Sequence, residues 1–432
     1  MTGLLGIAAA SLGQVAAGLV KVKGHKFVVN NQPYYFIGAN MWYAGLLAVD
    51  GVKGKQRLEH ELDFLKSKGI TNIRVVLGAE GGVQLLNGVR PIHPAIQPEQ
   101  GRFDEKVFYG VDFLLRALGK RKMNAVFFFS NNWEWSGGFL QYLTWNGKLN
   151  RDSVAKKIEW DNYRDYVSRF YSCDACMDAY WAYVRKVLQR TNSITGRKYT
   201  ADPAVMAWEV ANEPRPMRPY AMPAYEAFLR KTTALIKSID KHHLVTLGAE
   251  GDIGTESAEA YERIHRDKNV DYLTIHIWPK NWSWFQGSAI AEGMDSVISK
   301  GNDFISRHAA IAARIGKPLV IEEFGLPRDG HSFDTSATTV FRDKWFETVF
   351  AHLMESRKKG GVIGGAGFWA FGGEGRPVAG QVFWKEGDAL LGDPPMEEQG
   401  LNTVFDSDAS TWKIIESFIQ PTHSTHGTTG RQ

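Results

Sequence analysis

The 432-residue chain has little cysteine, almost no excess of either charge and no long apolar run in its interior. It carries 51 Lys and Arg against 47 Asp and Glu, a formal net charge of +4, and no block of basic residues. This balance argues against a nucleic-acid partner and against an anionic membrane surface. A membrane-spanning helix needs about 20 apolar residues. No segment beyond the first 20 residues supplies such a run, so we expect no membrane span.

The only two cysteines, Cys173 and Cys176, lie in the sequence CDAC. A zinc site usually needs a second pair of ligands, and none lies nearby. A redox CxxC pair normally follows a strand, whereas this pair follows RDYVSRFYS. Two interpretations stay open: a local disulfide in an exported protein, or two free thiols.

The two ends of the chain differ in composition from its interior. Residues 1–20 contain an apolar stretch and small residues, as at the end of a secretion signal, but lack the positively charged start of such signals. We expect this segment to be a leader remnant or a disordered extension, and residues 421–432 to be a disordered tail. The protein is expected to be secreted, periplasmic or attached to the cell surface.

Short β-branched or aromatic runs alternate with amphipathic stretches along the interior of the chain. Eight such alternations predict one α/β domain over residues 21–420, a single (β/α)₈ TIM barrel. An open doubly wound sheet is the alternative, but Gly38-Ala39-Asn40 after the first run does not supply its glycine-rich phosphate motif. The predicted strands are Tyr35–Trp42, Asn72–Gly78, Asn124–Ser130, Val205–Glu213, Leu244–Glu250, Asp271–Trp278, Pro318–Gly325 and Gly365–Phe371.

Two long insertions follow predicted strands, one from Asn131 to about Asp202 and one from Gly372 to about Thr403. Both are rich in tryptophan, glycine and charged residues, and the whole chain holds 14 Trp. Loops after the strands of a barrel lie on its catalytic face, so these long βα loops are expected to wall a substrate cleft. Indole faces suit the flat C–H faces of sugar rings.

Carboxylates stand at the ends of two predicted strands. Glu213 closes the run AVMAWEVANEPRP, and Glu322-Glu323 lie near the end of the seventh run. Two carboxylates facing each other across a cleft are what glycosidic-bond cleavage requires, although a structural ion pair is the alternative. Strand alternation lets at most one of Glu322 and Glu323 point inward, and Pro214 favours an extended Glu213. Glu209 lies deeper and is expected to be a buried, hydrogen-bonded structural carboxylate.

The motifs WEVANEPR, EEFG and FWAF, taken in this order, resemble glycoside hydrolase family 5. The motifs NNW and HIWPKNW are similar to its endo-β-1,4-mannanase branch, and the resemblance runs from about Lys21 to about Phe418. It implies a retaining hydrolase on a (β/α)₈ barrel, without a metal or an organic cofactor. Glu213 would be the acid/base, and Glu323, rather than Glu322, the nucleophile.

The resemblance also implies a set of substrate-binding residues around the two glutamates. Many family members carry Tyr where this chain has Trp278, whose indole N–H could donate to the nucleophile instead. The implied residues are Arg74, Asn132, Trp133, Asn212, Arg215, His276, Trp278 and Trp369.

Each glutamate needs a different protonation state for this chemistry. We expect Arg74 to favour the ionised form of Glu323, and burial and a neighbouring negative charge to keep Glu213 protonated near neutral pH. Retention also requires the two carboxyl groups to lie roughly 5–5.5 Å apart.

The expected function is cleavage of internal β-1,4-mannosidic bonds of mannan, glucomannan or galactomannan by double displacement, by a monomer whose partner is the polysaccharide. An endo-β-1,4-glucanase and an exo-acting β-mannosidase are alternatives on the same scaffold. A non-catalytic carbohydrate-binding protein is a further alternative, but Glu213 and Glu323 are both present.

Overall fold

The computed structural model describes residues 18–77, 79–82 and 84–419. The predicted tail over residues 421–432 lies outside the described residues, as does all but the end of the predicted leader segment over residues 1–20.

Eight parallel strands form one sheet in the order β8-β7-β6-β5-β4-β11-β10-β9. Backbone hydrogen bonds from Asp271 N to Val245 O (2.8 Å) and from His276 N to Glu250 O (3.2 Å) join the two outer strands and close the sheet on itself. The predicted TIM barrel is therefore confirmed, with every predicted strand present. The strands are β4 (Phe36–Asn40), β5 (Asn72–Val76), β6 (Asn124–Phe128), β7 (Val205–Glu209), β8 (Leu244–Thr246), β9 (Leu273–Ile277), β10 (Leu319–Phe324) and β11 (Ile363–Phe368).

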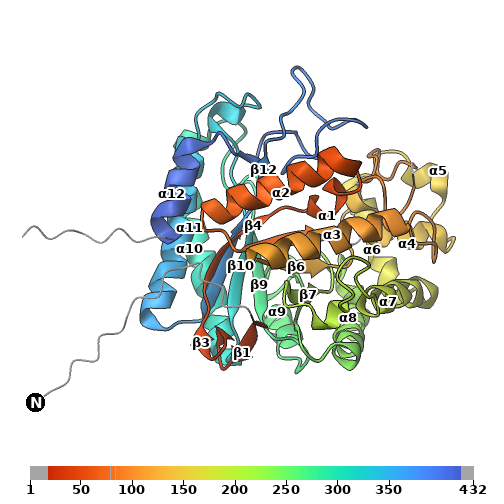
Figure 1. Ribbon diagram of the computed structural model, residues 1–432. Coiled ribbons are helices and arrows are strands. Elements are labelled where there is room, and N and C mark those ends of the chain that lie inside the picture. Colours follow the sequence, from red (N-terminus) through yellow and green to blue (C-terminus); the bar gives the residue numbers. More distant parts are fainter. Residues whose placement is uncertain (1–17, 78, 83, 420–432) are drawn as a thin grey trace, which may run out of the picture.

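Burial on both faces explains why these runs form the barrel. Every residue of the eight strands is buried, as parallel strands covered by helices require. Figure 1 shows the helices surrounding the strands. The helices are α1 (Ala44–Leu47), α2 (Gly51–Ser67), α3 (Glu105–Arg121), α4 (Gly138–Trp145), α5 (Arg151–Val154), α6 (Trp160–Ser168), α7 (Asp174–Leu188), α8 (Met222–Ile239), α9 (Ala258–His265), α10 (Ile290–Ile315), α11 (Val340–Lys359) and α12 (Ala409–Ile419), with 3₁₀ turns at Glu134–Ser136, Arg169–Ser172, Tyr199–Ala201, Pro219–Ala221 and Asp329–His331.

A small antiparallel sheet of β1 (Lys21–Lys23), β2 (Lys26–Val29) and β3 (Gln32–Pro33) covers one end of the barrel, at the bottom of Figure 1. Phe27 of β2 packs against Phe36 and Tyr272 inside the barrel, at centroid distances of 6.3 and 5.3 Å. This small sheet covers the end at which the barrel strands begin. The opposite end, at the carboxyl ends of the strands, remains for the functional site.

The two long insertions lie at that opposite end. The first carries α4 to α7, and the second carries β12 (Phe371–Gly373), which pairs with β13 (Val404–Phe405). Cys173 and Cys176 form a disulfide at the start of α7, which selects a local disulfide over two free thiols. None of the described helices combines the length and the apolar character that crossing a bilayer demands.

Candidate active site

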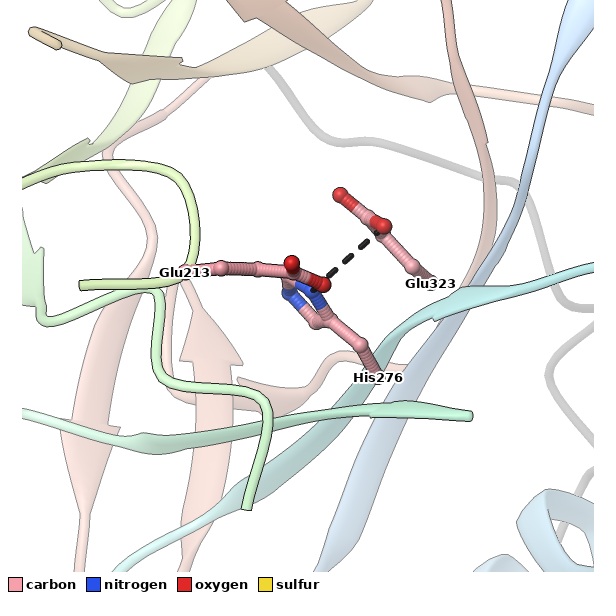
Figure 2. Close-up of side chains that lie close together, drawn as sticks. All are labelled: Glu213, His276 and Glu323. Carbon is pink, nitrogen blue, oxygen red and sulfur yellow. Dashed lines mark hydrogen bonds and ion pairs between the residues drawn. The ribbon is translucent and has the colours of Figure 1, made fainter. Parts of the chain in front are cut away.

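The ends of the barrel strands bring the two predicted catalytic glutamates together with His276, which was predicted to bind substrate (Figure 2). Glu213 follows β7, His276 lies on β9 and Glu323 on β10, and all three are buried. His276 Nδ1 lies 2.7 Å from Glu213 Oε1 and 3.4 Å from Glu323 Oε2. One oxygen of each carboxylate and a ring nitrogen of His276 all lie within 4.8 Å of one another.

The backbone at Glu213 departs from the extended conformation that Pro214 was expected to impose. Glu213 has a φ of 50°, in the left-handed region, because its N–H donates to Gly248 O (2.9 Å) from the turn after β8. Gly248 itself has a φ of +77°, and a Cβ there would lie 2.0 Å from Ala211 O. The contact between these two turns therefore overrides the local preference at the proline and directs the Glu213 side chain to the barrel axis.

The expectation that only one of Glu322 and Glu323 points inward was wrong. Ile321 pairs with Ile275 and Glu323 pairs with His276, so Glu322 is an extra residue in β10 relative to β9. Such a bulge interrupts the alternation of side chains. Glu322 Oε2 consequently lies 3.4 Å from His276 Nε2, beneath the pair formed by Glu213 and Glu323.

Arg74 on β5 connects the carboxylates of two other strands, β7 and β10. Its guanidinium donates to Glu323, to Asn212 Oδ1 (2.8 Å) and, through two N–H groups, to Glu209 at 2.5 and 3.0 Å. Glu209 is fully buried. It is therefore the hydrogen-bonded structural carboxylate that the sequence predicted.

Each of the two carboxylates also receives an indole N–H. Trp133 Nε1 donates to Glu213 Oε2 at 2.6 Å, and Trp278 Nε1 donates to Glu323 Oε2 at 3.2 Å. Trp278 also packs edge to face on Trp369, with ring centroids 5.9 Å apart. Trp278 thus makes the contact that the sequence suggested for it.

The remaining predicted residues surround this centre. The guanidinium of Arg215 is bound by both oxygens of the buried Glu250, each at 2.7 Å, and lies 4.9 Å from the centre of the Trp133 ring.

The buried donors Asn132 Nδ2 and Trp369 Nε1 have no hydrogen-bond partner. Buried donors are normally paired, so these two are available to a ligand.

The protonation state of Glu213 is the opposite of the expected one, because its carboxyl group is ionised rather than protonated. Burial alone would raise its pKa, but the hydrogen bond and positive charge of His276 lower the pKa of Glu213 to about 2. Burial alone would lower the pKa of His276, but the charge of Glu323 and the hydrogen bonds to Glu213 and Glu322 raise it to about 10. The proton of the cluster therefore resides on His276, next to Glu213 Oε1.

Burial raises the pKa of Glu323 above its ordinary value of 4.5, although His276 and Arg74 act in the opposite direction. Arg74 therefore favours the ionised form of Glu323, as predicted, but its charge does not bring the pKa below the ordinary value. Desolvation of the carboxylate outweighs the two nearby positive charges.

Glu213, His276 and Glu323 also form the one cluster of possible metal ligands found among the described residues. Their lone pairs, however, already accept hydrogen bonds from two indoles and from Arg74. The charge of Arg74 opposes the binding of a cation. The donor set is better suited to a pair of reacting carboxylates than to a metal ion.

Sequence reasoning missed three residues next to this centre. Glu250 follows β8, and its position at the end of a predicted strand was a usable signal. Trp160 and Tyr163 lie on α6 within the first insertion, and their rings stack on Trp133. The sequence predicted that this insertion walls the cleft, but it did not indicate which of its side chains contact Trp133.

The family model described as "GH family 5 beta-mannosidase-like" matches residues 17–425. Mannan endo-1,4-beta-mannosidase 7 of Arabidopsis thaliana is 27% identical over 369 residues, which cover 82% of this chain and 78% of that protein. Mannan endo-1,4-beta-mannosidase 5 of Solanum lycopersicum is 28% identical, over 82% and 80% of the two chains.

Solved structures give a similar result. The glycoside hydrolase family 5 mannosidase from Rhizomucor miehei superposes with a TM-score of 0.83 and 29% identity, over 93% of this chain and 97% of that one. The endo-1,4-beta-mannanase from the same organism has a TM-score of 0.65 at 21% identity, over 93% and 98% of the two chains, and shares the fold.

Proposed function

The chain belongs to the β-mannosidase-like group of glycoside hydrolase family 5, and from this premise we propose that it cleaves internal β-1,4-mannosidic bonds with retention of configuration. The observation that carries the proposal is the approach of Glu213 and Glu323 across the barrel mouth, with carboxylate oxygens within 4.8 Å. Retaining glycosidases have carboxyl groups roughly 5–5.5 Å apart, whereas inverting enzymes need about 6.5–9.5 Å to accommodate a water. The short separation favours retention.

In the first step, a carboxylate oxygen of Glu323 attacks C1 of the sugar, and the bond from C1 to the leaving oxygen breaks. Arg74 and the Trp278 N–H stabilise the ionised form of Glu323 that attacks. Glu213 gives a proton to the leaving oxygen. That proton reaches Glu213 from His276 across their 2.7 Å hydrogen bond.

In the second step, water replaces the leaving group. Glu213, now a carboxylate, takes a proton from the water as its oxygen attacks C1, and the ester bond to Glu323 breaks. Glu323 leaves as a carboxylate beside Arg74, and the hemiacetal keeps the configuration of the substrate. Both steps use the protein's own acid, base and nucleophile.

The surrounding groups are proposed to bind the sugar that is cleaved. Arg74 fixes the amide of Asn212 (2.8 Å), so that this amide can face the 2-hydroxyl. The unpartnered Asn132 Nδ2 and Trp369 Nε1 can donate to other hydroxyls. Arg215, predicted to bind sugar, is held by Glu250 and acts mainly by fixing Trp133.

Release of mannose from chain ends is a second candidate function. It is favoured by the match to the Rhizomucor miehei mannosidase over nearly the whole of both chains. The second insertion is fixed to the loop after β9, because Glu398 pairs with Lys280 at 2.6 Å. A loop fixed in this way can close one end of a cleft.

The test is the product profile on linear β-1,4-mannan and β-1,4-glucan, with Glu323→Ala as the inactive control. Mixed short oligosaccharides from mannan alone support internal cleavage. Mannose as the first product supports the second candidate, and cleavage of glucan alone contradicts the substrate assignment. Activity that survives in Glu323→Ala contradicts the mechanism.

We further propose that the protein is exported and acts as a monomer. The disulfide between Cys173 and Cys176 supports export, because such bonds persist in oxidising compartments.

A further inference from the structure

An exposed tryptophan lies beside the acid/base residue. All 14 tryptophans fall within the described residues, and Trp160 is the only one that is exposed, at 52%. Its indole lies on the first insertion, at the start of α6. A single exposed apolar side chain is common on protein surfaces, but this indole contacts aromatic rings that reach the site.

The ring of Trp160 belongs to a stack that begins at the reacting groups. Its centroid lies 6.2 Å from that of Trp133 and 6.0 Å from that of Tyr163, at interplanar angles of 26° and 14°. Tyr163 is buried, and its hydroxyl lies 2.7 Å from Glu134 Oε2 and 2.9 Å from Asn132 O. Trp133 donates to Glu213, so the stack leads outward from that carboxylate.

Ion pairs hold α6 in place. Arg218 pairs with Asp165 of α6 at 2.6 Å, and Arg164 of α6 pairs with Glu256 at 3.0 Å. The ring of Trp160 therefore has a fixed position relative to Glu213, although half of it faces solvent. A preorganised ring loses little conformational freedom when a ligand stacks on it.

The two sides of the site carry different aromatic groups. Trp278 and Trp369 adjoin Glu323, on the side of the sugar that is attacked. The stack of Trp133, Tyr163 and Trp160 adjoins Glu213, which protonates the leaving oxygen. We infer that a sugar ring of the leaving group stacks on the indole of Trp160. This sugar is a β-1,4-linked mannosyl residue beyond the one that carries the leaving oxygen.

This inference rests on the proposed function and adds a consequence for the second step. A sugar bound on Trp160 can present a neighbouring hydroxyl to the glycosyl-enzyme in place of water. Its oxygen then bonds to C1, its proton goes to Glu213, and the ester bond to Glu323 breaks to release a carboxylate. Trp160 should therefore raise the ratio of glycosyl transfer to hydrolysis at high oligosaccharide concentration.

The experiment compares β-1,4-mannobiose with mannotetraose as substrates for the unmodified protein, Trp160→Ala, Trp160→Phe and Tyr220→Ala. Tyr220 is an exposed aromatic (69%) whose hydroxyl bonds to Ser168 of α6. It makes no ring contact with the stack, so Tyr220→Ala is a matched control. Thermal unfolding of each variant verifies that the fold is kept.

We expect Trp160→Ala to lower kcat/KM for mannotetraose by about tenfold, mainly through KM, and to change mannobiose by less than about twofold. Trp160→Phe should restore most of the loss, and the transfer products of Trp160→Ala should decrease. Equal effects on both substrates, or none on either, would overturn the subsite while leaving the proposed function intact. If the unmodified protein cleaves neither oligosaccharide, the proposed function is overturned with it.

Discussion

His276 determines where the proton of the active site resides. Its imidazole lies 2.7 Å from Glu213 and 3.4 Å from Glu323, and these carboxylates raise its pKa to about 10. Glu213 is consequently ionised in the free protein, with a pKa of about 2. In the proposed mechanism, the acid of the first step is therefore a pair of residues that share one proton.

Replacing His276 with Gln should lower the pH at which activity is lost on the alkaline side. In the native protein the shared proton is lost only as the pH approaches about 10. Without the imidazole, the pKa of Glu213 rises, because burial is no longer opposed by His276, and Glu213 alone must hold the proton. We expect kcat/KM at pH 8 to fall by about 10²-fold. The pH profile of His60→Gln, an exposed site, is the control, and an unmoved alkaline limb contradicts this role.

Glu213→Ala should have an effect that depends on the leaving group. Cleavage of mannan needs protonation of a poor leaving group, so kcat/KM should fall by about 10²–10⁴-fold. A dinitrophenyl β-mannoside, whose leaving group needs no proton, should lose far less in its first step. Stopped-flow measurement of the phenolate burst distinguishes the two, and an equal loss on both substrates would falsify the acid/base assignment.

The N–H of Trp278 stabilises the charged form of Glu323 through a 3.2 Å hydrogen bond. Trp278→Phe removes this donor and should lower kcat by roughly 10–100-fold, the effect of losing one hydrogen bond to a charged group. It should also raise the pKa of Glu323 and move the acid limb of kcat/KM to higher pH. Trp282→Phe is the control, and an unchanged acid limb in Trp278→Phe argues against this hydrogen bond.

At the scale of the elements, the strands were predictable and their local irregularities were not. Short β-branched or aromatic runs predicted all eight barrel strands. The bulge at Glu322 depends on how β10 is aligned with β9, and the left-handed φ of Glu213 depends on the turn after β8. Both are tertiary effects that override local preference, so neither periodicity nor Pro214 could reveal them.

A buried carboxylate joins the loop after β5 to the first insertion. Glu80 Oε2 accepts a hydrogen bond from Gly138 N at the start of α4 (3.1 Å), and Glu80 Oε1 has no partner. Burial raises the pKa of Glu80 from its ordinary value of 4.5 to about 8, although the nearby Ser130 hydroxyl and the Gly138 N–H act in the opposite direction. Its contribution to stability is complete below pH 4.5 and is lost as the pH rises through 8.

Glu80→Gln should therefore stabilise the protein at alkaline pH. The neutral amide does not ionise, so the melting temperature of the variant should exceed that of the native protein by several degrees at pH 8.5. The difference should disappear near pH 4.5. Differential scanning calorimetry across this range, with the exposed Glu292→Gln as control, measures the effect. A difference that is independent of pH would show that Glu80 is ionised in the folded state.

At the scale of the whole molecule, the sequence predicted the barrel, the family and the positions of the two glutamates. Ordered strands fix which side chains reach one end, so Glu213, His276 and Glu323 could be assigned to one site. The paths of the long insertions could not be predicted, because contacts such as Lys280 with Glu398 join segments far apart in sequence. The protonation pattern could not be predicted either, since it depends on distances to His276.

The central claim is that Glu323 forms a covalent bond to a β-mannosyl group. The most direct test is mass spectrometry of the protein after incubation with 2-deoxy-2-fluoro-β-mannosyl fluoride, a substrate whose glycosyl-enzyme forms faster than it hydrolyses. We predict one added fluoromannosyl group per chain, on the peptide that contains Glu322 and Glu323, and its loss in Glu323→Gln but not in Glu322→Gln. An adduct on Glu213 or Glu322, or the turnover of mannan without any adduct, would contradict it.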